Sequence, residues 1–347
     1  MERKKILIVG GGLAGTTLAH RFLNHGCDVT ILDKGENHAT AIAAGMVNPM
    51  VFRRMNKSWR LDEFIFEAQK FYRSLEIKLD HKLFHPITIR RMFSSTQERD
   101  SWEGKEKLTE FKDFLEVISE NDKHFNQAKN EFGSGRLKNS FWIDAKTYYD
   151  ANLAYFDKHT TFLKEVFSLN DFNPEQAVYK GKKYDHVVFC CGYLNKYIPF
   201  FENAPIQQTK GQTLTISSNE IIKDESLNRK CFILPIGDDK FRIGATYEWN
   251  DESLKITEES KDLLLENLKV IGDYNINILE QSAGIRPTVL DRRPIMGQHT
   301  TYKKLFIFNG LGTKGYLMAP TLSREMCDFI LQEKALDKEV SLGRFSS

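Results

Sequence analysis

The sequence KKILIVGGGLAG, residues 4–15, decides the fold predicted for this chain. A short apolar run leads directly into a G-x-G-x-x-G pattern, a helical pattern of apolar residues follows, and a second apolar run, VTILD at 29–33, ends on an acid. This order is typical of a β-α-β unit that binds a dinucleotide. Gly10 permits the tight turn, Gly12 lets the backbone approach a pyrophosphate, and Gly15 lets the helix pack closely on the strand. The alternative is a glycine-rich turn in another kind of α/β protein.

Two features beside this turn suit the phosphates and a ribose. The N-terminus of the helix that follows Gly12 offers free N–H groups, and the positive end of its dipole, to the phosphates. Asp33 stands near the spacing of about 20 residues at which a carboxylate reaches a ribose hydroxyl. We therefore expect Asp33 to bind the ribose, with the neighbouring Lys34 as the alternative.

Composition limits the other classes of protein. The 347 residues suffice for about two domains, and contents of 41% hydrophobic and 28% charged residues are typical of a soluble globular protein. A net charge of +2 does not by itself indicate a nucleic-acid partner. No apolar run approaches about 18 residues, so we expect no membrane span. The run after Lys5 is too short for a signal peptide.

The five cysteines indicate a reducing compartment. They form no C-x-x-C pair and their number is odd, which favours free thiols in a cytoplasmic enzyme. The adjacent Cys190 and Cys191 leave two interpretations open. They are either two small residues that end a buried strand or a redox pair.

Glycine-punctuated segments far apart in the sequence predict one cofactor domain that is interrupted by a second domain. Beyond the first β-α-β unit these segments are 40–49, 184–192 and 305–315, the last two being apolar runs of the kind found in buried parallel strands. Helical periodicity resumes at Leu317.

The intervening segments predict a sheet-based substrate domain. Residues 206–250 alternate in the manner of antiparallel strands, and 258–271 read as an amphipathic helix. The predicted class is α/β, with a Rossmann-type dinucleotide-binding domain, which the resemblance given below identifies as FAD-binding, interrupted by an α+β substrate domain whose sheet is mainly antiparallel. Further strands are expected at 83–93 and 276–285. The predicted limits are 1–80, 141–205 and 284–347 for the first domain, and 81–140 and 206–283 for the second.

A series of short motifs resembles a known family. In chain order the motifs are 10–15, 40–46, 187–192, 209–212, 234–246, 283–297 and 310–320. In this order they are similar to the D-amino-acid oxidase superfamily of FAD-dependent oxidoreductases, and to the glycine oxidases in particular. The resemblance covers nearly the whole chain. Residues 43–49 and 310–315 also resemble the FAD domain of the bifunctional enzyme that finishes modified wobble uridines in tRNA, without its methyltransferase half.

The resemblance implies noncovalent FAD as the cofactor. Relatives that attach flavin covalently use a Cys after the R-P motif, and residues 287–304 contain none. Asp33 is a departure, since members of the family usually have Glu there. The implied cofactor-binding residues are Gly10, Gly12, Leu13, Ala14, Gly15, Asp33, Lys34, Thr40, Ala44, Gly45, Met46, Val166, Cys191, Gly192, Gly312, Thr313, Lys314 and Gly315.

The turn at 310–315 favours a flavin over a nicotinamide. A second helix that begins near Thr313 would face the pyrimidine end of the flavin ring, and its dipole favours the negative charge that gathers there on reduction. A nicotinamide ring needs no such terminus. Lys314 would add a full positive charge, and the alternative is a solvated lysine at a helix start.

Arg286 matches the family arginine that binds the substrate carboxylate. A planar guanidinium holds a carboxylate bidentately and so places the substrate α-carbon over flavin N5. The alternative is a structural arginine that binds loop carbonyls. Tyr247, Trp249 and Tyr316 either line the pocket or pack in the core. We count Arg286, Tyr247, Lys314 and Tyr316 as candidate catalytic residues.

The implied chemistry requires no protein base. An amine bound as its free base passes a hydride from its α-carbon to flavin N5, and the resulting imine hydrolyses in water. Oxygen or another acceptor would reoxidise the flavin. His81 and His85 lack a third ligand, so no metal site is expected. The basic and aromatic residues at 52–60 are either a solvated face or a contact for RNA phosphates.

Three functions follow from these observations. The first is FAD-dependent oxidation of a small amine or amino acid, in an oxidase or a dehydrogenase. The second is oxidation of a carboxymethylamino group on a tRNA uridine, because that group is also a secondary amine next to a carboxylate. The third is a binding protein with a flavin fold and no turnover.

Overall fold

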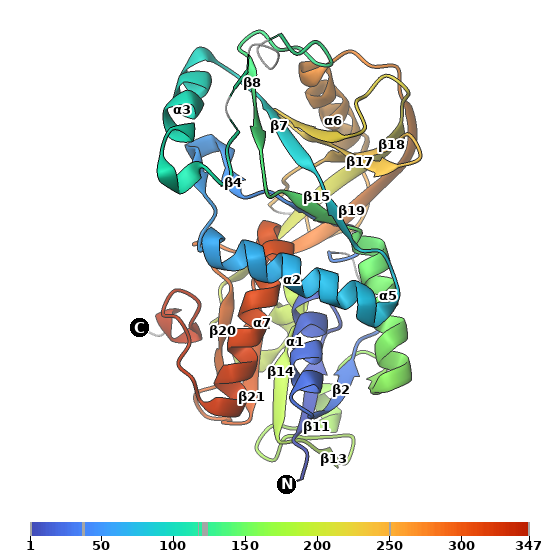
Figure 1. The fold of residues 1–347 in the computed structure, drawn as a ribbon. Helices are drawn as coiled ribbons and strands as arrows, with labels where there is room; N and C mark the ends of the chain where they lie inside the picture. Colours follow the sequence, from blue (N-terminus) through green and yellow to red (C-terminus); the bar gives the residue numbers. More distant parts are fainter. Residues whose placement is uncertain (1, 37–38, 117, 120–123, 250, 346–347) are drawn as a thin grey trace.

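The computed structural model describes residues 2–36, 39–116, 118–119, 124–249 and 251–345. It has two lobes, each built on its own sheet, and both chain termini lie in the lobe drawn at the bottom of Figure 1. We call this the lower lobe and the other the upper lobe.

The lower lobe contains a six-stranded sheet in the order β10-β2-β1-β14-β21-β20. All neighbouring strands are parallel except β20, which is antiparallel to β21. Ile6 and Ile8 of β1 belong to one core cluster, and Leu7 and Val9 belong to another. This strand therefore reads as a continuous apolar run because both of its faces are buried. The strands are β1 (Lys5–Val9), β2 (Asp28–Leu32), β10 (Thr161–Leu163), β14 (His186–Phe189), β20 (Ile295–Gln298) and β21 (Leu305–Asn309).

Helices cover one face of this sheet. Residues of α1 and α7 share a core cluster with those of α2 and α5, and α2 crosses the molecule where the two lobes meet (Figure 1). The opposite face packs against a small antiparallel sheet, β11-β12-β13. The elements are α1 (Leu13–Asn24), α2 (Leu61–Leu79), α5 (Ala145–His159), α7 (Gly315–Gln332), β11 (Phe172–Asn173), β12 (Val178–Tyr179) and β13 (Lys182–Lys183).

The upper lobe contains a seven-stranded sheet in the order β19-β15-β18-β17-β16-β7-β8. Every neighbouring pair is antiparallel except β16 and β7. Leu264, Leu268 and Ile271 of α6 pack against the sheet. The elements are β7 (Thr88–Met92), α3 (Thr96–Glu106), β8 (Ser134–Leu137), β15 (Ile206–Ser217), β16 (Glu225–Asn228), β17 (Phe232–Gly237), β18 (Lys240–Gly244), α6 (Glu258–Ile271) and β19 (Asn277–Val289).

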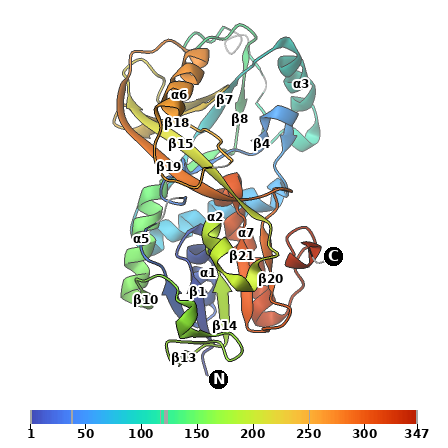
Figure 2. The same cartoon turned by 180° about the vertical axis from the view of Figure 1, so that it is seen from behind.

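Two long strands connect the lobes. β15 and β19 pair antiparallel from Ile206–Val289 at one end to Ser217–Asn277 at the other, and Figure 2 shows them side by side where the lobes meet. The remaining short strands form a three-stranded sheet, β3-β9-β6, and a two-stranded sheet, β4-β5. These are β3 (Met46–Val47), β4 (Met50–Val51), β5 (Asn56–Lys57), β6 (Phe84–Pro86) and β9 (Phe141–Ile143).

The predicted fold class is confirmed. The lower lobe is a mainly parallel sheet with helices, and the upper lobe has a mainly antiparallel sheet. The predicted helix at 258–271 coincides with α6. The predicted domain limits stay a prediction, and the limit at residue 284 falls inside β19. Among the described residues, no helix combines the length and the apolar character needed to cross a membrane.

Candidate active site

A cavity of about 1190 Å³ lies between the lobes. Pockets for small molecules and cofactors usually measure about 300–1,000 Å³, so this one has room for a large ligand. Its wall includes the first turn of α1, the loop before β3, the start of α7 and the end of β19. Of the predicted cofactor-binding residues, only Gly15 does not line this cavity. The residues that line it are Gly10, Gly12, Leu13, Ala14, Asp33, Lys34, Thr40, Ala44, Gly45, Met46, Val166, Cys191, Gly192, Gly312, Thr313, Lys314 and Gly315.

Gly15 lies behind the cavity, where α1 packs on the turn that precedes it. A Cβ at Gly15 would lie 1.9 Å from the carbonyl oxygen of Gly10, so this approach of helix and turn requires glycine. Gly10 itself has a φ of 109° and donates its N–H to Leu32 O at 2.8 Å. These contacts agree with the turn and packing roles expected from the motif.

The N-terminus of α1 opens on the cavity. Its N-cap, Gly12, provides no side-chain cap, and the first turn carries no acidic residue. The structure corrects one detail, because the N–H of Leu13 is not free. It donates to Thr40 Oγ1 at 2.9 Å. Thr40 O in turn accepts a hydrogen bond from the hydroxyl of Tyr316 at 3.0 Å. The loop around Thr40 therefore connects the starts of α1 and α7.

Asp33 lines the cavity and also holds the glycine turn. Its Oδ2 accepts a hydrogen bond from Gly11 N at 2.6 Å, and its Oδ1 accepts one from Gly35 N at 2.7 Å. The hydroxyl of Tyr149 lies 3.4 Å from Oδ1. Burial, and next the charge of Asp33, raise the pKa of Tyr149. Since each carboxylate oxygen accepts about two hydrogen bonds, Asp33 keeps acceptor capacity for a ribose. Neighbouring Lys34 instead pairs with Glu36 at 2.6 Å.

The start of α7 forms another part of the wall, and Lys314 is fixed there. Its Nζ donates to Asn48 O at 2.9 Å, to Met50 O at 3.2 Å and to Ser58 Oγ at 2.5 Å. Burial lowers the pKa of Lys314 to about 8. The alternative of a solvated lysine at a helix start is therefore wrong. The side chain joins the turn before α7 to the segment 48–58 by hydrogen bonds.

Tyr316 lines the cavity but is packed in the core. Its ring lies 5.6 Å from that of Tyr148 and 6.0 Å from that of Tyr72, measured between ring centroids. The side chain is fixed at its ring by these aromatic contacts and at its hydroxyl by Thr40 O, and burial raises the pKa of Tyr316. Both interpretations of Tyr316, pocket wall and core packing, describe part of its position.

Arg286 lies in β19 at the cavity wall, and its guanidinium is half-buried. Nη1 donates to Thr246 O at 3.4 Å, and Cζ lies 4.8 Å from the centroid of the Tyr247 ring. Burial lowers its pKa. Among the ion pairs between described residues, none involves Arg286. One long hydrogen bond leaves most of its five N–H donors to the cavity. Trp249, in contrast, does not line the cavity.

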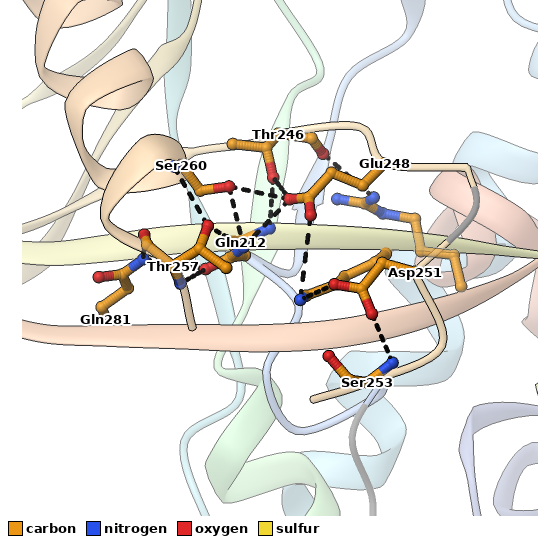
Figure 3. Close-up of polar contacts among 10 residues, drawn as sticks. Gln212, Thr246, Glu248, Asp251, Ser253, Thr257, Ser260 and Gln281 are labelled. Atoms are coloured by element: carbon orange, nitrogen blue, oxygen red, sulfur yellow. Dashed lines mark hydrogen bonds and ion pairs between the residues drawn. The ribbon is translucent and has the colours of Figure 1, made fainter. Parts of the chain in front are cut away.

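A polar cluster holds the segment that carries Thr246 and Tyr247 (Figure 3). Glu248 Oε1 accepts hydrogen bonds from Gln212 Nε2 at 3.0 Å, Thr246 Oγ1 at 3.0 Å and Ser260 Oγ at 2.9 Å. Sequence reasoning identified Gln212 only as part of a family motif. A lysine and a glutamine two residues apart, Lys210 and Gln212, in a predicted antiparallel strand were the signal available for this cluster.

Lys210 anchors the other side of the cluster. It is fully buried, and its Nζ lies 2.5 Å from Asp251 Oδ2 and 3.9 Å from Glu248 Oε2. The hydrogen bond from Lys210 is the main reason that the pKa of Asp251 falls to about 2. The ion pairs of Lys210 thus fix the chain that follows the exposed Tyr247, and the hydrogen bond from Thr246 Oγ1 to Glu248 fixes the residue before it.

Other candidates from the sequence have simpler roles. Cys190 and Cys191 are free thiols, and burial raises the pKa of Cys191 to about 12. This agrees with small residues at a strand end, since a reactive thiol needs a lowered pKa.

His85 stacks on Trp142, and the described residues contain no group of three metal-binding side chains.

Two of the four cations in the basic and aromatic segment 52–60 are ion-paired. Lys57 pairs with Asp62 at 2.8 Å, and Arg60 pairs with Glu63 at 2.6 Å and with Glu325. Arg53 and Arg54 are exposed and enter none of the ion pairs between described residues, so both interpretations of the segment, a solvated face and a contact for RNA phosphates, stay open.

Comparison with known proteins identifies the class. The profile of the family described as FAD dependent oxidoreductase (DAO) matches residues 5–329, and the chain belongs to this family. FAD is the cofactor of this family, and the glycine turn, the open terminus of α1 and the size of the cavity fit it.

Individual relatives are distant. The chain is 24% identical to the tRNA 5-methylaminomethyl-2-thiouridine biosynthesis bifunctional protein MnmC of Campylobacter jejuni, over 88% of this chain and 48% of that protein. It thus spans about half the length of these bifunctional relatives. It is 21% identical to a glycine oxidase of Bacillus licheniformis, over 95% of this chain and 94% of that protein.

Solved structures share the fold. Iminodiacetate oxidase from Chelativorans sp. BNC1 aligns with a TM-score of 0.79 at 18% identity, covering 97% of this chain and 99% of that one. Glycine oxidase from Bacillus cereus aligns with a TM-score of 0.79 at 18% identity, covering 96% of both chains.

Proposed function

We propose that this FAD-dependent oxidoreductase oxidises a small amine or amino acid that carries a carboxylate. The observation that carries the proposal is the position of Arg286, whose guanidinium faces the same cavity as the glycine turn and the start of α7 and has no acidic partner among the ion pairs of the described residues. A half-buried arginine without a counter-ion is suited to bind an anionic group from outside the protein.

The chain's own residues supply binding and orientation. The N-terminus of α1 would hold the pyrophosphate, Asp33 the ribose, and the start of α7 the pyrimidine end of the ring. When bound, FAD accepts the hydride from the substrate α-carbon. Arg286 would fix the carboxylate and so align that carbon, which is the positioning contribution to the rate.

The remaining steps need no further protein group. The substrate nitrogen donates its lone pair as the hydride leaves, and the imine that results hydrolyses to a carbonyl compound and an amine or ammonia. The electron acceptor is oxygen or another oxidant. No lysine, histidine or carboxylate is assigned as a base, because an amine bound as its free base has no proton to lose before the transfer.

A second candidate is oxidation of a carboxymethylaminomethyl-type side chain on a tRNA uridine. The similarity to the bifunctional tRNA-modifying proteins favours it, and Arg286 suits that substrate equally. Retention of the protein on immobilised tRNA at increasing salt distinguishes the two, because phosphate contacts give a steep dependence on salt. Lys57 and Arg60 are already ion-paired, so retention on tRNA through this segment would depend on the exposed Arg53 and Arg54.

Anaerobic reduction of the bound flavin tests the proposal. The yellow protein is mixed without oxygen with a panel of amines, with and without a carboxylate, and the loss of visible absorption is followed. We expect bleaching by at least one amino acid or secondary amine with a carboxylate. If no member of the panel bleaches the flavin, the protein is a binding module or acts on a macromolecular substrate, and the proposal fails.

A further inference from the structure

Gly211 and Arg286 lie on the same face of two neighbouring strands. In the antiparallel pair of β15 and β19, Gly211 stands opposite Gly284, and Thr209 stands opposite Arg286. Side chains alternate along a strand, so positions two residues apart share a face. Gly211, Gly284 and Arg286 all line the cavity, so their common face is the one toward it.

The guanidinium of Arg286 occupies the space that a side chain at position 211 would fill. A Cβ at Gly211 would lie 2.2 Å from both Nη1 and Nη2 and 2.4 Å from Cζ. The guanidinium Cζ also lies 4.8 Å from the centroid of the Tyr247 ring. The group therefore contacts both an aromatic ring and a strand position without a side chain.

Backbone conformation does not explain this glycine. Gly211 is not among the glycines with positive φ, so an alanine fits its backbone. A glycine inside a strand weakens the strand, and it often marks a place where another group must approach closely. Here the approaching group is the charged end of Arg286.

The strand cannot move away from an added side chain. The residues on either side of Gly211 are fixed by the polar cluster, since Lys210 N and Glu248 O are 2.9 Å apart and Gln212 N donates to Thr246 Oγ1 at 2.9 Å. The guanidinium is the end of a long, flexible side chain. With an alanine at position 211 the guanidinium therefore moves and the fold remains.

We propose that Gly211 is a positioning residue, which sets the guanidinium of Arg286 at the place where it receives the substrate carboxylate. This inference rests on the proposed function, because it requires that Arg286 binds a carboxylate. It assigns a role in substrate binding to a residue that need not touch the substrate.

The test is the affinity of the oxidised FAD-bound protein for a simple carboxylate, propionate, read from the perturbation of the flavin absorption spectrum. We expect Gly211→Ala to keep its FAD and to raise the Kd for propionate by about 10–100-fold, the size of effect that the loss of one charge-assisted hydrogen bond has on affinity. Gly104→Ala is the matched control. Gly104 lies exposed in α3, where a Cβ meets no atom within 4 Å, and the Kd should not change.

A double variant shows whether Gly211 acts through Arg286. Arg286→Ala and the combined Arg286→Ala, Gly211→Ala protein should bind propionate equally weakly, because the group that position 211 controls is already absent. A further loss in the combined variant, or an unchanged Kd in Gly211→Ala, overturns the positioning role alone. If Arg286→Ala binds propionate as tightly as the wild type, the proposed function and the role of Gly211 are overturned together.

Discussion

Lys314 Nζ donates a hydrogen bond to Asn48 O at 2.9 Å, although 266 residues separate the two in sequence. This contact, with those to Met50 and Ser58, joins the start of α7 to the segment that leads into α2. The ammonium is therefore both a structural link and a positive charge in the cavity wall, and its titration is open to measurement.

The first prediction concerns pH. Burial lowers the pKa of Lys314 from 10.5 to about 8, so between these values the unfolded chain keeps a proton that the folded chain has lost. The free energy of unfolding contributed by this group therefore rises with pH from about 8 to 10.5. Relative to Lys314→Met, the FAD-free wild type should gain about 3 kcal/mol across this window, since one pKa unit corresponds to about 1.4 kcal/mol. Urea unfolding measures it. Parallel curves for the two proteins would contradict the buried state.

The second prediction concerns Asp33, which holds Gly11 N and Gly35 N as well as facing the cavity. Asp33→Ala should weaken FAD binding by about 1.5–3 kcal/mol, a tenfold to hundredfold loss of affinity. Flavin fluorescence during titration of the FAD-free protein measures it. Tyr149→Phe, which removes only a 3.4 Å contact to Asp33, serves as the control and should change little. Equal affinities for Asp33→Ala and wild type would assign the ribose to backbone groups.

The third prediction concerns the N-cap of α1. Gly12 lines the cavity where the pyrophosphate is expected, so the branched side chain in Gly12→Val should occupy that space and abolish FAD binding. The purified variant should be colourless while its circular dichroism stays close to that of the FAD-free wild type. A yellow variant with full FAD occupancy would show that the glycine turn does not bind the cofactor.

The fourth prediction concerns the attachment of FAD. The sequence between Pro287 and Lys304 contains no cysteine, and no covalent anchor is expected. Acid or heat should therefore release all of the flavin into the supernatant after the protein is precipitated. Yellow colour that stays with the precipitate would show a covalent bond.

The sequence predicted those parts of the site that depend on neighbouring residues. The turn from β1 to α1 could be predicted because its glycines, its apolar strand and its helix follow one another. The role of Arg286 was inferred from the resemblance of its motif to the family, and it stays a prediction. The contacts between distant segments could not be predicted. Lys314 meets Asn48, and Glu248 meets Gln212, only because the chain returns to the same place.

The alternation of apolar and polar residues predicted strands in the upper lobe, but it did not predict which strands pair with each other. Strand β16 pairs with β7, from which it is far away in the sequence: the paired residues Ser226 and Ile89 are 137 residues apart. This pair is parallel, whereas the other pairs of that sheet are antiparallel. Pairing is decided by which strand edges the rest of the fold leaves free, and the local pattern does not contain that information.

The last prediction tests the carboxylate site. Arg286→Ala should keep the yellow FAD complex. It should lose about 3–5 kcal/mol of transition-state stabilisation, which is the range for breaking a buried charge pair. That is about two to four decades in kcat/KM for an amino acid, measured by anaerobic flavin reduction in a stopped-flow instrument. Arg286→Lys should recover little, because an ammonium cannot reproduce the two-pronged contact.

Two controls separate lost binding from a damaged fold. Arg99→Ala, which removes a guanidinium paired with the adjacent Asp100 at 2.9 Å on α3, should leave the reduction rate unchanged. An amine substrate without a carboxylate should reduce the flavin at nearly the same rate in wild type and Arg286→Ala, because it makes no contact that the variant has lost. If both substrate types lose activity equally while FAD is retained, Arg286 instead supports the wall of the cavity through Thr246 and Tyr247.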